Sequence, residues 1–110
     1  MRLLDFFKVS INRELDKQKP GIIALAEAQI NQIPDNMSLD AVKSKVVEIV
    51  SGAVSKNITR LPGYQQVLIA GILYQFSGYL DKQIGTVLST SVYKKKAIVV
   101  VDQFIEGAHL

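Results

Sequence analysis

The stretch from Leu61 to Leu80 contains no charged side chain, and this feature constrains the fold of the 110-residue chain more than any other. From Val67 to Leu80, apolar residues fall on every side of a 3.6-residue turn, which is the pattern of a helix that is buried all round. Such a helix needs neighbours on more than one face. We therefore predict a buried central helix over about residues 62–89, with the rest of the chain packed around it.

Three glycines recur seven residues apart on one side of this predicted helix: Gly71, Gly78 and Gly85. A glycine inside a helix costs roughly 1 kcal/mol relative to alanine, so the three together cost about 3 kcal/mol. Small residues allow the backbones of two helices to approach closely, and such a contact could offset this cost. The spacing therefore predicts a close helix–helix contact, either within the chain or between subunits. The alternative is a solvent-facing side on which the glycines only loosen the helix.

Segments with apolar residues at three- and four-residue spacing make up most of the remaining chain, as expected of amphipathic helices around a core. They cover about residues 3–17, 20–33, 39–60 and 92–106. Pro20, Pro34 and Pro62-Gly63 separate them, because the residue before a proline is pushed out of the helical region. Ser38 or Asp40 is placed to cap the helix that follows Pro34. We predict an all-α fold in which the whole chain, residues 1–110, forms one domain. About five helices make a compact bundle or orthogonal array around the buried central helix.

The segment 97–101 is the one part of the chain whose apolar run also fits a buried strand. However, Val101 shares a helical face with Phe104, Gly107 stands where a helix should stop, and a lone strand would have no partner. We therefore predict a last helix here, with Ser91 as its N-cap.

The composition excludes several kinds of site. The chain has no cysteine, and its one histidine, His109, is the penultimate residue, so disulfides, catalytic thiols and Cys/His zinc sites are ruled out. The formal net charge of +3 permits an anionic partner without requiring one. The amino-terminal segment has too short an apolar run and too many charges for a signal peptide, so we expect an intracellular protein or one within a virion.

The remaining side chains do not suggest a catalytic or cofactor site. Glu27, Glu48 and Asp81 are acids on largely apolar helices, but we interpret them as boundary residues that face water. The sequence contains neither a phosphate-binding glycine loop nor the ligand spacing of a calcium loop. We therefore expect no enzymatic activity, no cofactor and no metal.

Two other classes of function remain open. Lys94, Lys95 and Lys96 form the only basic run and could contact an anion such as nucleic-acid phosphate, although on a helix they point in three directions. A solvated first turn is the simpler interpretation. The segment Leu61–Leu80 is about long enough to span a bilayer, but Gln75 lies at its middle and its strongly apolar part is shorter, so membrane association is the second alternative.

Apolar residues outside the predicted core faces favour an assembly function. Phe6, Val9 and Val99 lie off the stripes that an intramolecular core would use, and the glycine series adds a further surface. We therefore predict a non-enzymatic structural protein that associates with itself, as a homo-oligomer, or docks into a larger protein assembly. The small size and the lack of catalytic chemistry also suit a component of a phage or another virion.

Overall fold

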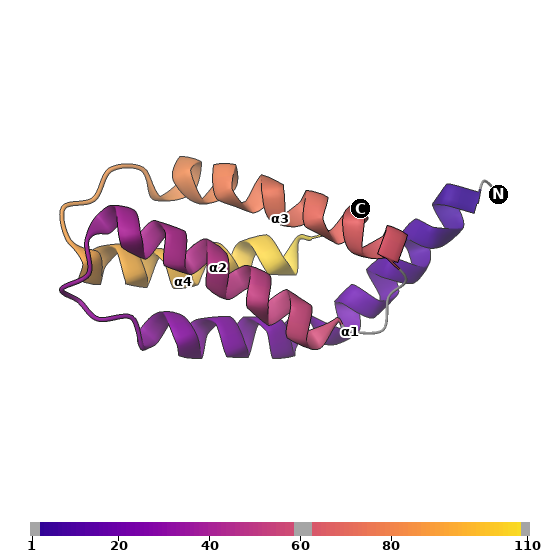
Figure 1. Ribbon diagram of the computed structural model, residues 1–110, viewed down its shortest axis with the longest axis horizontal. Coiled ribbons are helices and arrows are strands. Elements are labelled where there is room, and N and C mark those ends of the chain that lie inside the picture. Colours follow the sequence, from indigo (N-terminus) through magenta and orange to yellow (C-terminus); the bar gives the residue numbers. More distant parts are fainter. Residues whose placement is uncertain (1–2, 59–62, 109–110) are drawn as a thin grey trace.

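Four helices form the fold in the computed structural model (Figure 1), which describes the backbone of residues 3–58 and 63–108 and the side chains of residues 9, 10, 12–58 and 70–108. They are α1 (Leu3–Asn31), α2 (Leu39–Asn57), α3 (Gly63–Ile84) and α4 (Thr90–Glu106). The two described ranges contain no strand, so the predicted all-α bundle is confirmed, and segment 97–101 is helical. The bundle has four helices, one fewer than the approximate number expected.

The first two predicted helices form one long helix, α1, which continues through Pro20. The predicted break before Pro20 was therefore wrong. A proline inside a helix removes one backbone hydrogen bond, bends the helix and costs about 3 kcal/mol. Leu15 on one side of Pro20 and Ile22 and Ala26 on the other are buried in the same core, and this burial offsets the cost. Helix α1 accordingly changes direction in Figure 1, and its first turns project beyond the end of the bundle.

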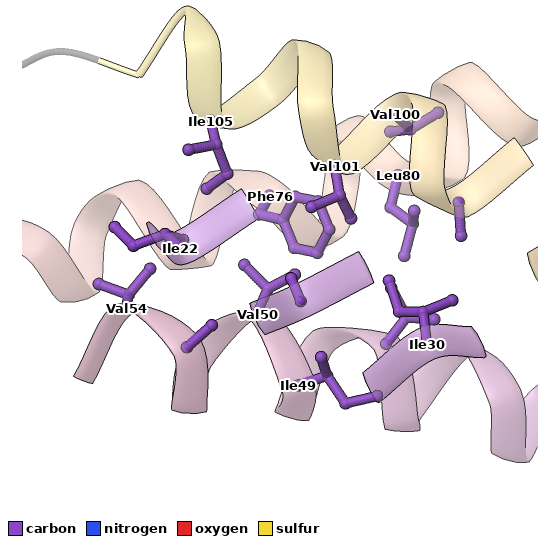
Figure 2. Close-up of a cluster of buried hydrophobic side chains, with 14 of the residues drawn as sticks. Ile22, Ile30, Ile49, Val50, Val54, Phe76, Leu80, Val100, Val101 and Ile105 are labelled. Atoms are coloured by element: carbon purple, nitrogen blue, oxygen red, sulfur yellow. The ribbon is translucent and has the colours of Figure 1, made fainter. Parts of the chain in front are cut away.

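Helices α2 and α4 each pack against the three other helices, with α1 and α3 on opposite sides of the pair (Figure 1). Side chains from all four helices meet in one core, shown in Figure 2. The largest fully buried side chains are Phe76, Ile22, Ile30, Leu80, Ile105, Val42, Val46, Val50 and Val101. Each helix therefore contributes one apolar stripe to a shared interior and leaves its other side outside.

Helix α3 lies on the outside of the bundle and is not buried all round, contrary to the prediction. Phe76 and Leu80 face the core, whereas Tyr74 is 86% exposed. The helix ends at Ile84 because Gly85 has a φ of +64°, a left-handed conformation that glycine adopts without strain. The expected continuation to about residue 89, with Gly85 inside the helix, was therefore also wrong.

Serine side chains cap the first turns of α2 and α4. Ser38 Oγ accepts a hydrogen bond from the backbone amide of Ala41 at 3.2 Å, as predicted. At α4 the cap is Ser89 rather than Ser91: its Oγ accepts from the Val92 amide at 3.2 Å. Helix α4 therefore begins about two residues earlier than predicted, at Thr90.

Candidate functional site

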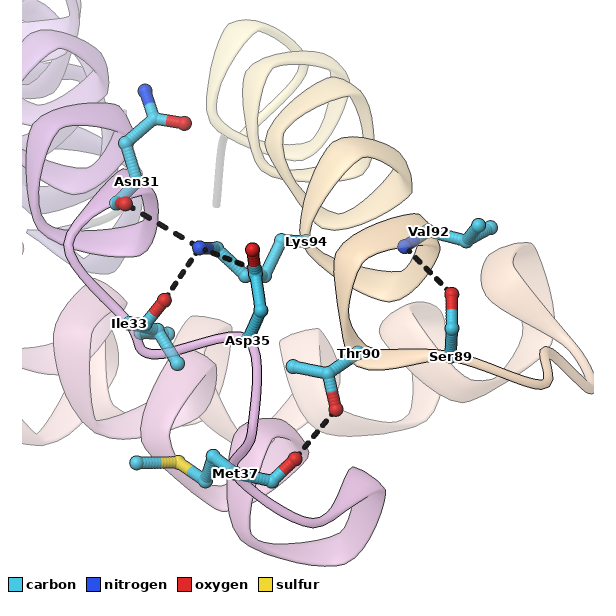
Figure 3. A network of polar contacts seen from close by, with 8 residues as sticks. All are labelled: Asn31, Ile33, Asp35, Met37, Ser89, Thr90, Val92 and Lys94. Carbon is cyan, nitrogen blue, oxygen red and sulfur yellow. Dashed lines mark hydrogen bonds and ion pairs between the residues drawn. The ribbon is translucent and has the colours of Figure 1, made fainter.

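Lys94, in the second turn of α4, is joined to the end of α1 and the turn that follows it (Figure 3). Its ammonium group donates hydrogen bonds to the backbone carbonyls of Asn31, at 3.4 Å, and Ile33, and lies 3.1 Å from a carboxylate oxygen of Asp35. The last carbonyls of a helix lack internal partners and carry partial negative charge, so a cation stabilises them. With a side chain only 13% exposed, Lys94 acts as a C-terminal cap for α1.

The predicted anion contact over residues 94–96 is therefore divided between two sides of α4. Lys94 is occupied by carbonyl oxygens and Asp35 on the inner side. Lys95 and Lys96 are exposed on the outer side. A surface that binds phosphate through this run would have two lysines rather than three, which weakens the case for nucleic acid.

Two further contacts hold the ends of α4. Thr90 Oγ1 donates a hydrogen bond to the backbone carbonyl of Met37 at 2.5 Å (Figure 3), and Thr90 is buried. At the other end, Lys19 of α1 donates from Nζ to the backbone carbonyl of Glu106 at 2.9 Å. Both ends of α4 are bonded to α1 or to the turn after it, so the rotation of α4 about its own axis is set. This rotation determines which residues of α4 lie on its outer face.

Among the described residues, the glycine series makes no close helix–helix contact. Gly71 and Gly78 lie on the exposed side of α3, and no atom of another described element would lie within 4 Å of a Cβ added at either position. The same holds for Gly85, which lies just beyond the helix. The described residues therefore supply no internal partner helix for this series, and this side of α3 is exposed. A contact between the glycines and another subunit stays a prediction.

The other predicted contact residues lie on different helices. The side chain of Phe6 is outside the described residues. Val9 is exposed on α1, and Val99 is 55% exposed on α4. The structure therefore does not bring Val9, Val99 and the glycines of α3 together on a single helix face.

Val99 belongs to a continuous exposed face of α4. Positions 92, 95, 96, 99 and 103 recur at three- and four-residue spacing, so they lie on one side of the helix, and all five are exposed. We name this face the α4 stripe. It consists of Val92, Lys95, Lys96, Val99 and Gln103. Valines follow its centre, and a lysine lies on either side of them.

Leu88, in the loop just before α4, is a further exposed apolar side chain, at 96%. It immediately precedes the N-cap Ser89. From this position an apolar residue often packs against the fourth residue of the helix, here Tyr93. Because Leu88 is almost fully exposed, that packing is not made. Sequence analysis missed both Leu88 and Val92, although the seven-residue spacing of Val92 and Val99 was a usable signal.

Tyr93 lies on the inner side of α4, behind the stripe. Its hydroxyl group is buried and has no hydrogen-bond partner among the described residues. Burial, and to a lesser degree the nearby carboxylate of Asp81, raise the pKa of Tyr93 to about 12, so the phenol stays neutral at physiological pH. Asp81 itself forms an ion pair with Lys43 of α2, at 2.5 Å. The ion pair therefore joins α2 and α3, and Tyr93 beside it presents no reactive phenolate.

Two shallow grooves lie elsewhere on the surface. One, of about 490 Å³, runs between the end of α1 and α2 and includes Lys45, Glu48 and Lys56 in its lining. Lys45 and Glu48 form an ion pair with each other at 3.6 Å. The other groove, of about 270 Å³, lies between α3 and α4 beside Tyr79 and Phe104. Among the described residues, neither lining contains a serine, threonine, cysteine or histidine.

No protein family model, curated protein or solved structure matches this chain. Among the side chains described within residues 3–58 and 63–108, no three histidine, cysteine or acidic residues are grouped so that they could hold a metal ion. No helix in those ranges is both long enough and apolar enough to cross a membrane. The α4 stripe with Leu88 is the surface on which we base a function.

Proposed function

We propose that this chain is a non-enzymatic helical assembly protein, which associates with copies of itself or docks into a larger protein complex through its outer helix faces. The observation that carries the proposal is the exposed face of α4 with Val92 and Val99, together with Leu88, which is exposed just before the helix. Single apolar residues on a surface are common and need no explanation, but a contiguous line of them marks an interaction surface more often.

The core does not need these three side chains. Helix α4 already buries a separate apolar stripe that includes Ala97, Val101 and Ile105. Contacts at both ends of α4 keep the valines on the outer side. Covering Leu88, Val92 and Val99 would remove apolar area from water, which favours association by about 25 cal/mol for each Å² covered. A second protein surface is the occupant that this gain favours.

A weak, sequence-independent contact with nucleic acid is the competing function. Lys95 and Lys96 would contribute to it, but exposed valines and a leucine add nothing to the binding of phosphate. An assembly function accounts for both the charged and the apolar members of the α4 stripe. Mass measurements with and without DNA separate the two functions.

We expect the purified chain to form a reversible oligomer, whose mean mass rises with protein concentration in the absence of DNA. Val99→Asp should abolish this rise, because it places a charge in the centre of the apolar line, while the circular dichroism spectrum stays helical. Sedimentation equilibrium measures the mean masses of the wild-type chain and of the Val99→Asp variant. Gly78→Leu is the matched test of α3: the position is open in the isolated chain, so the leucine has room, and mass should not change.

Two other outcomes would count against this proposal. A chain that remains monomeric at all concentrations, and gains mass only with added DNA, would favour nucleic-acid binding. If Gly78→Leu dissociates the oligomer and Val99→Asp does not, the contact lies on α3, and the glycine series is the assembly surface.

A further inference from the structure

The two edges of the α4 stripe carry different side chains. At about 100° per residue, Lys95, Asp102 and Glu106 fall on one side of the line through Val92 and Val99. Lys96 and Gln103 fall on the other side. Lys95, Lys96, Gln103 and Glu106 are exposed, and Asp102 is half-buried. One edge is therefore basic near the start of the helix and acidic near its end, whereas the other edge has no acid.

We infer that a second copy of this chain docks antiparallel on the α4 stripe, about a two-fold axis that passes beside Val99. In an antiparallel pair related in this way, each edge of the helix meets the same edge of the copy in reverse order. A residue four positions before Val99 in one chain then lies opposite the residues three to seven positions after Val99 in the second copy. Lys95 of each chain therefore faces Asp102 and Glu106 of the second copy, and a symmetric interface contains this pairing twice.

The other edge fits the same arrangement. Lys96, three positions before Val99, lies opposite Gln103 of the second copy. The glutamine is uncharged, so it does not repel the lysine. Val99 meets Val99 of the second copy at the axis, and Val92 covers the aliphatic part of the other chain's Glu106 side chain. Antiparallel α4 helices also place the positive end of each helix dipole near the negative end of the other.

A parallel pair does not fit the charges. A two-fold axis along the helices would bring each edge against the opposite edge at the same height. Lys95 of one chain would then face Lys96 of the other, twice in the dimer, and like charges at that distance repel. Charge complementarity thus selects the antiparallel orientation, and it selects a copy of this chain over an unrelated acidic surface, because the chain carries the required acids in the required order.

This inference rests on the proposed self-association, and its test is a charge exchange followed by sedimentation equilibrium in DNA-free buffer. Lys95→Glu should weaken dimerisation by about ten-fold or more, because a carboxylate would face two carboxylates in each half of the interface. Adding Asp102→Lys and Glu106→Lys to Lys95→Glu should restore the dissociation constant to within about three-fold, since the charges are reversed on both sides.

Lys96→Glu is the matched control: it changes the net charge by the same amount at the adjacent residue, but faces the second copy's Gln103, so it should alter the dissociation constant by less than about three-fold. Equal losses for Lys95→Glu and Lys96→Glu, or no restoration by the triple exchange, would overturn the antiparallel pairing and leave self-association standing. A wild-type chain that is monomeric throughout would overturn both.

Discussion

Phe76→Ala should lower the free energy of unfolding by about 3–5 kcal/mol, a large part of the 5–15 kcal/mol typical of a small domain. Phe76 is fully buried and its ring lies 5.0 Å from that of Phe104, centroid to centroid. The substitution removes this ring contact and leaves a cavity where α3 packs on α4. Urea unfolding followed by circular dichroism measures the loss.

Tyr74→Ala is the control on the same helix. Tyr74 is almost fully exposed, and surface substitutions of this kind usually change stability by less than about 0.5 kcal/mol. The contrast tests the position of α3 directly. If both substitutions cost several kcal/mol in a monomeric protein, α3 is surrounded on all sides, and the peripheral position described above is wrong.

Lys94→Ala should be the second most damaging of the proposed substitutions, with a loss of about 1–3 kcal/mol. It removes the hydrogen bonds to the carbonyls of Asn31 and Ile33 and the ion pair with Asp35. The carbonyls at the end of α1 would lose a charged partner whose side chain is only 13% exposed. Thermal and urea unfolding of dilute, monomeric protein provide the measurement.

Lys96→Ala, two residues further along α4, is the matched control, since this lysine is exposed and should contribute less than about 0.5 kcal/mol. Equal and small effects for Lys94 and Lys96 would mean that the whole basic run is a solvated surface. In that case the contacts of Lys94 in Figure 3 contribute little to stability.

The helical class and most of the core could be predicted from the spacing of apolar residues. The continuity of α1 could also have been inferred: Leu15 and Ile22 are seven residues apart, and Ala26 follows four residues later, which keeps all three on one face across Pro20. The preference of proline for the end of a helix does not decide the structure here. The free-energy cost of a proline inside the helix is smaller than the gain from burying the residues on either side.

The position of α3 could not be predicted from charge alone. Between residues 70 and 80 its outer side lacks charges, as a buried side would, but it consists of small residues and side chains such as Tyr74 that tolerate water. Hydropathy does not distinguish a side that packs from a side that is only uncharged. Gly71 and Gly78 add to this ambiguity, because glycine suits either a close contact or open solvent.

The residues of the α4 stripe could likewise not be identified from the local sequence. The run of three lysines is one feature in the sequence, but helical geometry sends Lys94 to the inner side and leaves Lys95 and Lys96 outside. The role of Lys94 depends on a turn about sixty residues earlier in the chain, which no local pattern reveals. The exposure of Val92 and Val99 likewise depends on which other residues of α4 the core accepts.

The central claim, that the α4 stripe pairs with itself about an axis beside Val99, can be tested with a single introduced thiol, because the chain contains no cysteine. At a two-fold axis, Val99→Cys places two thiols within reach of a disulfide, whose Cα atoms lie about 4.4–6.8 Å apart. We predict that mild oxidation converts most of this variant to a covalent dimer, much faster than it converts the control Tyr74→Cys, although Tyr74 is the more exposed of the two positions. Equal rates for the two variants, or a faster reaction at Tyr74→Cys, would contradict the account.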